Sequence, residues 1–300
     1  QEATDLAGYV TEAAAKETGL SPGTPVITGT DDSGAEAISA GVVEPGNMMI
    51  QFGSSIYMIL GTRHLVDDER LWREQFIVPG LCDISAGTNT GGSLTKWYRD
   101  ELFSDALEQE KKTGIDAYQL MLEGVDQVPP GSDGLITLPY FAGERTPVND
   151  PLACGILFGL TISHTRRHLY RSALEGVAYS IQQQLRLMES HEDVSIDQIF
   201  AVGGGVNNAL WMQIVADVTG REINTPDVTV GASYGDAMMA AVGVRHPGFE
   251  NFSCLAQHIK TGTVYKPDFK KYKIYQKYQA IYDKLYDSTC ELMHMMTEEQ

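Results

Sequence analysis

Residues 199–220 read Ile-Phe-Ala-Val-Gly-Gly-Gly-Val-Asn-Asn-Ala-Leu-Trp-Met-Gln-Ile-Val-Ala-Asp-Val-Thr-Gly. The first four residues are apolar, which predicts a short buried strand. Three glycines follow this run directly, and an amphipathic helix is predicted to begin near Asn207 and to end at Gly220. The stretch therefore predicts a strand and a helix joined by a glycine turn.

The glycine run 203–205 is a candidate ligand site. Glycine has no Cβ, so backbone of this kind can lie flat against a ligand. The amino end of the following helix adds backbone N–H groups for an anionic or polar ligand. The run lacks the GxGxxG spacing of a dinucleotide fold and the Lys-Ser/Thr of a P-loop. Taken alone, it fits either a ligand site or a plain strand-to-helix turn.

The composition is that of a globular chain with a strong negative charge. Hydrophobic residues make up 43% of the 300 residues, enough for a core in one large domain or two small ones. The formal net charge of −18 argues against a nucleic-acid partner, whose phosphates need Lys and Arg. No apolar run approaches the roughly 20 residues of a membrane span, and the first residues show no leader pattern. We therefore expect a cytoplasmic protein without a membrane partner.

The cysteines are interpreted as thiols buried in the core of a protein from a reducing compartment. They form no CxxC pair, and no histidine stands near them at ligand spacing. The sequence thus predicts neither a metal site nor a disulfide framework. The four residues are Cys82, Cys154, Cys254 and Cys290.

The remaining elements follow from periodicity and from turn residues. Helices are predicted over residues 3–18, 115–124, 165–189 and 231–244, after Gly29 and after Ser93, and from residue 266 to a frayed end at 297–300. Extended segments are predicted over residues 26–28, 48–52, 56–60, 74–78, 84–86 and 135–141. No repeat, low-complexity region or linker divides the chain.

Two aspartates, Asp31 and Asp32, precede a helix of small residues. Ser33 and Glu36 have the spacing of a capping box, which would place Asp32 just before the helix. The positive end of the helix dipole keeps a carboxylate ionised there, as a general base for a hydroxyl proton requires. The alternative is that both aspartates only cap the helix.

The segments 48–52 and 56–60 predict a β-hairpin with Gly53, Ser54 and Ser55 at its tip. Such a tip can offer two backbone N–H groups and two hydroxyls to a phosphate. It is equally compatible with an ordinary turn.

The most specific resemblance to a known family lies in residues 155–175. They read Gly-Ile-Leu-Phe-Gly-Leu, then after seven residues His-Leu, and after two more Ser-Ala-Leu-Glu. This matches the second signature of the FGGY carbohydrate kinases position by position. From about residue 20 to about residue 290, the chain resembles the C-terminal half of these kinases. The resemblance implies an α/β, ribonuclease-H-like domain of the actin-like ATPase superfamily, with a mixed central sheet and helices on both faces.

The resemblance also implies catalytic and phosphate-binding residues. In the segment Gly-Thr-Asp-Asp at 29–32, Asp32 falls on the family's catalytic aspartate and Asp31 on a variable position. Gly53, Ser54 and Ser55 are similar to the Gly-Thr-Ser loop that holds nucleotide phosphate. Ser54 keeps the hydroxyl of the usual threonine.

Further residues align with the family's nucleotide site. Gly92 and Lys96, just before a tryptophan, match residues that line it. The segment 203–208 is similar to the adenosine motif, in which glycine backbone packs against base and ribose. Its assigned residues are Gly203, Gly204, Gly205 and Asn208. A polar loop at 143–147, Gly-Glu-Arg-Thr-Pro, is closest to xylulose- and gluconate-kinase-like members.

One departure from the family pattern concerns length, because family members are about two such domains long. Residues 1–300 correspond to the C-terminal nucleotide-binding domain. The N-terminal domain brings the first phosphate loop, a metal-binding aspartate and most sugar contacts. We therefore expect that domain, either in a longer parent chain or on another chain, as the main partner.

The resemblance implies ATP-dependent phosphorylation of a sugar hydroxyl, with Mg²⁺ bridging phosphate oxygens. A pentulose such as xylulose is the first choice of substrate, and gluconate or another polyol is the alternative. A different class of function also fits the glycine loops, namely a non-catalytic, actin-like nucleotide-binding module. We expect no metal ligand within this half. The oligomeric state stays open, with a homodimer as one option.

Overall fold

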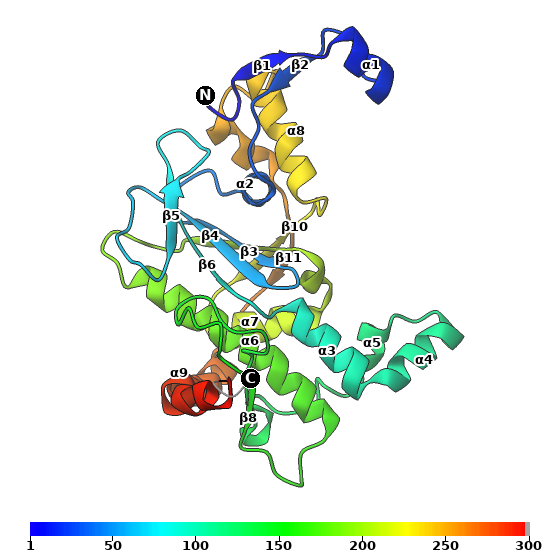
Figure 1. Cartoon of the computed structure of the whole chain (residues 1–300), viewed down its shortest axis with the longest axis vertical. Helices are drawn as coiled ribbons and strands as arrows, with labels where there is room; N and C mark the ends of the chain where they lie inside the picture. Colours follow the sequence, from blue (N-terminus) through cyan, green and yellow to red (C-terminus); the bar gives the residue numbers. More distant parts are fainter. Residues whose placement is uncertain (298–300) are drawn as a thin grey trace.

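The computed structural model describes residues 1–297, which form a central sheet with helices on both faces (Figure 1). The order of strands in this sheet is β11-β10-β9-β3-β4-β6-β5. Strand β9 runs parallel to its neighbours β3 and β10, and the other pairs are antiparallel, so the sheet is mixed. The strands are β3 (Asn47–Phe52), β4 (Ile56–Thr62), β5 (Trp72–Gln75), β6 (Cys82–Thr88), β9 (Gln198–Val202), β10 (Ile223–Pro226) and β11 (Thr261–Tyr265).

Two two-stranded sheets and the helices complete the described part of the chain. Strand β1 (Leu6–Tyr9) pairs with β2 (Pro25–Ile27), and β7 (Ile136–Leu138) with β8 (Ile156–Phe158). No helix in residues 1–297 is both long enough and apolar enough to cross a membrane. The α-helices are α1 (Glu12–Thr18), α2 (Asp32–Ser39), α3 (Gly92–Leu102), α4 (Ser104–Thr113), α5 (Ala117–Met121), α6 (Arg166–Glu189), α7 (Ala209–Thr219), α8 (Ala232–Gly243) and α9 (Phe269–Thr297).

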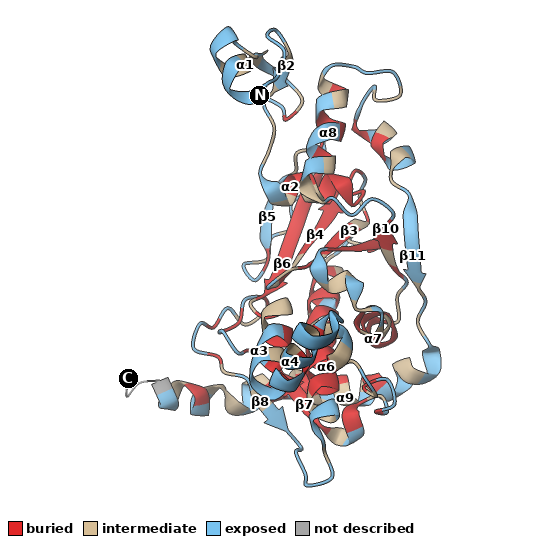
Figure 2. Cartoon of the chain, turned by 90° about the vertical axis from the view of Figure 1, so that its right-hand side faces the viewer, coloured by how far each residue is buried: buried red, intermediate tan, exposed pale blue. Residues whose placement is uncertain are grey.

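Alternation along the strands divides the core between the two faces of the sheet. In β3, Met48 and Ile50 join a large apolar cluster with residues of α3, α6, α7 and α9. Met49 points the other way and packs with Ala37 and Ala40 of the α2 segment. Helix α2 therefore covers one face, with α8 packed on α2, and α6 and α7 cover the other face. The strands between them are largely buried (Figure 2). This confirms the predicted α/β architecture.

The strand, glycine turn and helix predicted for 199–220 are confirmed, with one shift. Strand β9 leads into a short 3₁₀ turn, Gly204–Asn207, and α7 begins after it. Asn208 caps α7 by accepting a hydrogen bond from the backbone N–H of Trp211 at 3.0 Å. Gly220 ends the helix in the left-handed conformation, with φ 70°. The helix thus starts later than predicted. Its cap at Asn208 also occupies one of the backbone N–H groups that we expected to be available to a ligand.

Two predictions are wrong, and one helix is missed. Residues 3–18 do not form one helix, because β1 pairs with β2 and Thr11 then caps the shorter α1. Helix α4 was not predicted, since its sequence is highly charged and Ala106 is its buried residue. Of the cysteines, Cys82 is buried but the other three are only half-buried, although all four are unpaired.

The capping box predicted for α2 is also wrong. The helix begins at Asp32, and its N-cap is Asp31, whose Oδ1 accepts a hydrogen bond from the backbone N–H of Gly34 at 2.7 Å. Ser33 lies inside the first turn, and Glu36 accepts a hydrogen bond from Gln51 of β3 instead of closing a box. Asp31 occupies the cap because its side chain reaches the third N–H of the helix.

Near the C-terminus, α9 packs on the body of the domain as predicted, with Tyr275 and Tyr282 buried. The helix extends to Thr297, and the rest of the predicted frayed end, residues 298–300, lies outside the described residues.

The segment 155–175 places a buried carboxylate at the centre of this packing. Glu175 of α6 is 1% exposed and accepts hydrogen bonds from Arg171 Nε at 2.8 Å and from Tyr275 of α9 at 2.9 Å. The Ser132 hydroxyl and the Gly131 N–H also donate to it. Four donors thus join α6, α9 and the loop before β7 around one charge.

We expect Arg171→Met to destabilise the domain by about 3–5 kcal/mol, because it leaves the Glu175 carboxylate buried without its cation. Urea denaturation at pH 7 measures the loss. A suitable control is Lys266→Met, which removes an ion pair to Glu222 whose side chains are 73% and 54% exposed. That change should cost less than about 1 kcal/mol. Equal losses in the two variants would contradict a structural role for the buried pair.

Candidate functional site

The hairpin of β3 and β4 ends in the turn 53–55, which is held against the start of α3. The backbone N–H groups of Gly91 and Ser93 donate to the carbonyl of Ser54 at 2.9 and 3.0 Å. The Gly92 N–H donates to the carbonyl of Gly53 at 2.8 Å. A Cβ on residue 92 would lie 2.6 Å from that carbonyl oxygen, so the contact requires glycine.

The turn keeps its own donors available. Within residues 1–297, neither the backbone N–H nor the hydroxyl of Ser54 or Ser55 donates a hydrogen bond. The turn therefore presents two amides and two hydroxyls, as the sequence predicts for a phosphate-holding loop.

A cavity of about 940 Å³ lies beside this turn. It opens between the hairpin, the first turns of α3 and the 3₁₀ turn that precedes α7. Segments far apart in the sequence thus meet in a single site. Of the residues predicted for the nucleotide site, the cavity brings together Gly53, Ser54, Gly92, Lys96, Gly204, Gly205 and Asn208.

Three predicted residues do not line the cavity. Ser55 stands at the end of the turn, where its carbonyl accepts from the Gly53 N–H at 3.0 Å. Gly203 has φ 89°, and a Cβ there would lie 2.8 Å from the Phe52 carbonyl oxygen. Asp32 belongs to α2, on the other face of the sheet.

The three glycines of the run 203–205 differ in how closely they are packed. Gly203 packs against the backbone of β3. A Cβ on Gly205 would lie 2.8 Å from Phe52 Cβ and 3.0 Å from the Trp211 ring, so this position is also tightly packed. A Cβ on Gly204 would meet nothing within 4 Å. Gly204 is therefore the glycine that borders open space, and a ligand could approach it closely.

The sequence did not reveal the remaining walls of the cavity. Trp211 forms part of the floor, held by a hydrogen bond from Nε1 to the Leu174 carbonyl at 3.1 Å and packed edge-on to Phe52. The start of α5 forms another wall, far from the glycine run in sequence. No local pattern connects these segments. The additional lining residues are Phe52, Ser93, Thr95, Asp116, Tyr118, Gln119, Leu122, Tyr170, Asn207 and Trp211.

Asp32 lies at the same end of β3 as the cavity but on the opposite face of the sheet. Phe52 lines the cavity, and its neighbour Gln51 donates a hydrogen bond to Glu36 of α2. Successive residues of a strand face opposite sides. A ligand that binds in the cavity must therefore pass over the turn 53–55 to approach Asp32. The Asp32 side chain is exposed, and its Oδ1 accepts from the Ser33 N–H at 2.9 Å.

The loop 143–147 is more buried than its polar sequence suggests. Glu144 is 2% exposed and accepts from Thr88 Oγ1 at 2.6 Å and from the backbone N–H groups of Arg145 and Asn89 at 2.6 and 3.3 Å. Burial raises the pKa of Glu144 to about 7, against the effect of these donors. The buried carboxyl fixes the end of β6, from which the chain continues to Gly92.

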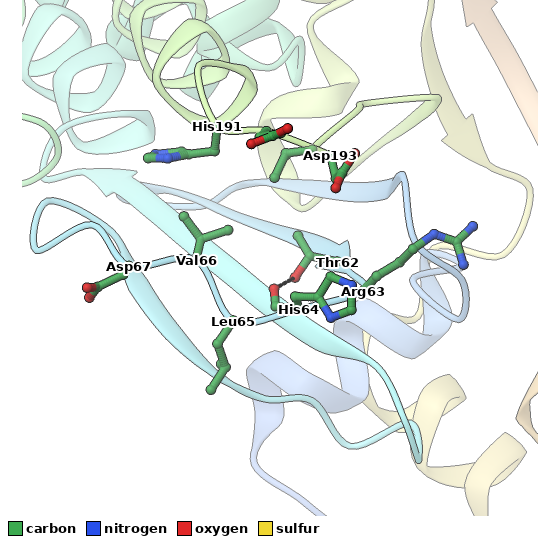
Figure 3. Close-up of a pocket in the computed structure, with 10 residues that line it drawn as sticks. Thr62, Arg63, His64, Leu65, Val66, Asp67, His191 and Asp193 are labelled. Carbon is green, nitrogen blue, oxygen red and sulfur yellow. Dashed lines mark hydrogen bonds between the residues drawn. The ribbon is translucent and has the colours of Figure 1, made fainter.

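A second, smaller cavity of about 200 Å³ lies at the opposite end of β4 (Figure 3). It is bordered by residues 62–67 and 191–194, and the Thr62 hydroxyl donates to the His64 carbonyl at 2.9 Å. None of the predicted site residues borders it. In the described part of the chain, no group of three or more His, Cys, Asp or Glu side chains is placed to hold a metal ion.

Comparison with known proteins supports the resemblance. Residues 48–244 match the FGGY family of carbohydrate kinases, C-terminal domain. The chain is 29% identical to a gluconokinase of Bacillus licheniformis, over 88% of this chain and 51% of that protein. It is 32% identical to a ribulokinase of Geobacillus thermodenitrificans, over 94% of this chain and 51% of that protein.

Solved structures agree with this comparison. The xylulose kinase of Rhodospirillum rubrum superposes with a TM-score of 0.83 at 30% identity, covering 98% of this chain and 57% of that one. The gluconate kinase of Lactobacillus acidophilus gives 0.86 at 21% identity, over 99% and 58%, and shows the shared fold. The chain thus spans about half the length of these relatives.

We expect Gly204→Val to weaken ATP binding by at least about tenfold, because the side chain would fill the open space beside residue 204. Isothermal titration calorimetry measures the change, and thermal denaturation shows whether folding is affected. Gly8→Val is a matched control, since a Cβ there also meets nothing within 4 Å but lies in β1, away from the cavity. Unchanged ATP binding in the Gly204 variant would count against the site.

Proposed function

Because the chain belongs to the FGGY family of carbohydrate kinases, we propose that it is the nucleotide-binding half of an ATP-dependent sugar kinase. The observation that carries this proposal is the 940 Å³ cavity, which joins the hairpin turn, the start of α3 and the glycine run. It has an apolar floor, a cation in Lys96 and backbone that a ligand can approach at Gly204. These are the features that a nucleotide site requires.

The residues of this half would bind and position the reactants for in-line phosphoryl transfer. Adenosine occupies the cavity beside Gly204 and Asn208, and the phosphates extend over the turn that carries Ser54 and Ser55. The terminal phosphoryl group then arrives on the face of α2, where Asp32 accepts the proton of the acceptor hydroxyl. When bound, Mg²⁺ supplies positive charge to the phosphate oxygens. We propose that its protein ligand lies in the other half.

The acceptor is proposed to be a sugar or polyol hydroxyl, with a pentulose such as xylulose first and gluconate second. The names of the relatives support a sugar or polyol as the acceptor but do not agree on which one, because they include gluconokinases, xylulose kinases and ribulokinases. Most contacts to the acceptor are assigned to the N-terminal half, which is the proposed partner. The unpaired cysteines support a reducing, cytoplasmic setting.

Asp32→Asn in the full-length kinase should lower kcat by about 10²–10⁴-fold, because the amide cannot accept the proton. Asp31→Asn should have a mild effect, since asparagine also serves as an N-cap. Coupled measurement of ADP release gives kcat, and ATP titration shows that the nucleotide still binds. The reverse order of effects would overturn the assignment. Normal nucleotide binding with no turnover in the unaltered protein would favour a non-catalytic module.

Residues 1–300 alone should fold and bind adenine nucleotide weakly, because only one side of the cleft contributes contacts. They should release no ADP in response to xylulose or gluconate, since phosphoryl transfer requires the acceptor to be held in line at close range. Thermal stabilisation by ATP with Mg²⁺ and a sugar-dependent ADP assay test both statements. Robust sugar-dependent turnover by this half would show that its site is complete.

A further inference from the structure

The face of the sheet that carries α2 also carries carboxylates near the proposed base. In β6, Ile84 and Ala86 belong to the core beneath α6, so Asp83 and Ser85 point to the α2 face. Glu74 of β5 is the direct partner of Asp83 across the strand ladder. Directly opposed residues of an antiparallel pair lie on one face, so these two carboxylates are neighbours there.

Asp83 is a buried charge without a cation partner. It is 2% exposed, and its Oδ2 accepts a hydrogen bond from the Ser85 hydroxyl at 2.7 Å. Its Oδ1 is buried and has no hydrogen-bond partner within the described residues. Burial, together with the charges of Glu74 and Asp31, raises the pKa of Asp83 to about 6, against the bond from Ser85. The group is therefore largely ionised above pH 7, in a poorly screened position.

These carboxylates are continuous with the start of α2. Tyr57 of β4 packs against the cluster that contains Ala37 of the α2 helix, and its ring lies 6.0 Å from that of Trp72 in β5. The charge of Asp31 raises the pKa of both Tyr57 and Asp83. Glu36 follows Asp32 by one turn of the helix, and the two negative charges interact. We call this set the acidic face. Its members are Asp31, Asp32, Glu36, Glu74 and Asp83.

The nearby arginines only partly balance the acidic face. Arg145 lies on the same side, with its guanidinium 6.0 Å from the ring of Trp72, the partner of Ser85 in the ladder. Arg73 follows Trp72 in β5 and so points to the other side, where it pairs with Asp67 at 2.9 Å. Within residues 1–297, none of the five carboxylates takes part in an ion pair, which leaves this face negative.

We infer that the acidic face selects a neutral polyhydroxy acceptor, such as a ketose, and rejects a sugar acid. The inference rests on the proposed function, because Asp32 acts as a base only when the acceptor hydroxyl lies within hydrogen-bond distance of it. The acceptor is then adjacent to the acidic face. Hydroxyl groups of a neutral sugar can donate to carboxylates, whereas the carboxylate of gluconate is repelled by them.

The test compares kcat/KM of the full-length kinase for xylulose, ribulose and gluconate at saturating ATP with Mg²⁺. We expect the better neutral ketose to exceed gluconate by at least about tenfold. Glu74→Gln removes one charge from an exposed position of the acidic face. It should raise kcat/KM for gluconate by about threefold and change the ketose value less, because the glutamine oxygen still accepts a hydrogen bond from a hydroxyl. Glu108→Gln, on α4 and also exposed, is the matched control and should change neither value.

The outcomes separate this inference from the proposed function. A kinase that uses gluconate as well as or better than the ketoses would overturn the inference and leave sugar phosphorylation intact. An equal change for both substrates in the Glu74 variant would also overturn it, because a charge effect must distinguish an anion from a neutral sugar. Failure to phosphorylate any acceptor would reject the proposed function, and the inference with it.

Discussion

The parallel pairing of β3 with β9 is the constraint on which the nucleotide cavity depends. Gln51 pairs with Val202, so the two strands end together and their turns emerge side by side. Gly203 can then lie against the carbonyl of Phe52, at a distance that leaves no room for a Cβ. Because this contact brings the hairpin turn beside the glycine run, a bulkier residue at 203 would separate the two main walls of the site.

Strand β3 also lies between the proposed nucleotide site and the proposed catalytic base, which are on opposite faces of the sheet. Phe52 faces the cavity and Gln51 faces Glu36 on α2, so one residue step along β3 crosses from the nucleotide side of the sheet to the side of the proposed base. The turn 53–55 is the short bridge between the two sides. The Gly92 N–H holds this turn against α3. Because the phosphates would pass over the turn, its position affects both the nucleotide site and the approach to Asp32.

Local signals were sufficient to predict much of this arrangement from the sequence. The glycine stop at Gly220 and the small turn at 53–55 each depend on neighbouring residues, and both are confirmed. The sequence left two candidates for the cap of α2, the box at Ser33 and the aspartates, because both fit a local capping pattern, and Asp31 holds the cap. The wall at Asp116 could not be predicted, since its place beside the glycine run depends on long-range packing.

The two sides of the sheet differ in charge, so they interact differently with the phosphates of a nucleotide. Lys96 is the one cation among the described residues that line the cavity, in a chain of formal net charge −18. A triphosphate that crosses the turn 53–55 moves from this side toward the acidic face, where like charges oppose it. Under the proposed function, that approach becomes favourable only when cations accompany the phosphates, from bound Mg²⁺ or from basic groups of the other half. The acidic face thus gives an electrostatic reason, besides geometry, why catalysis should require both halves.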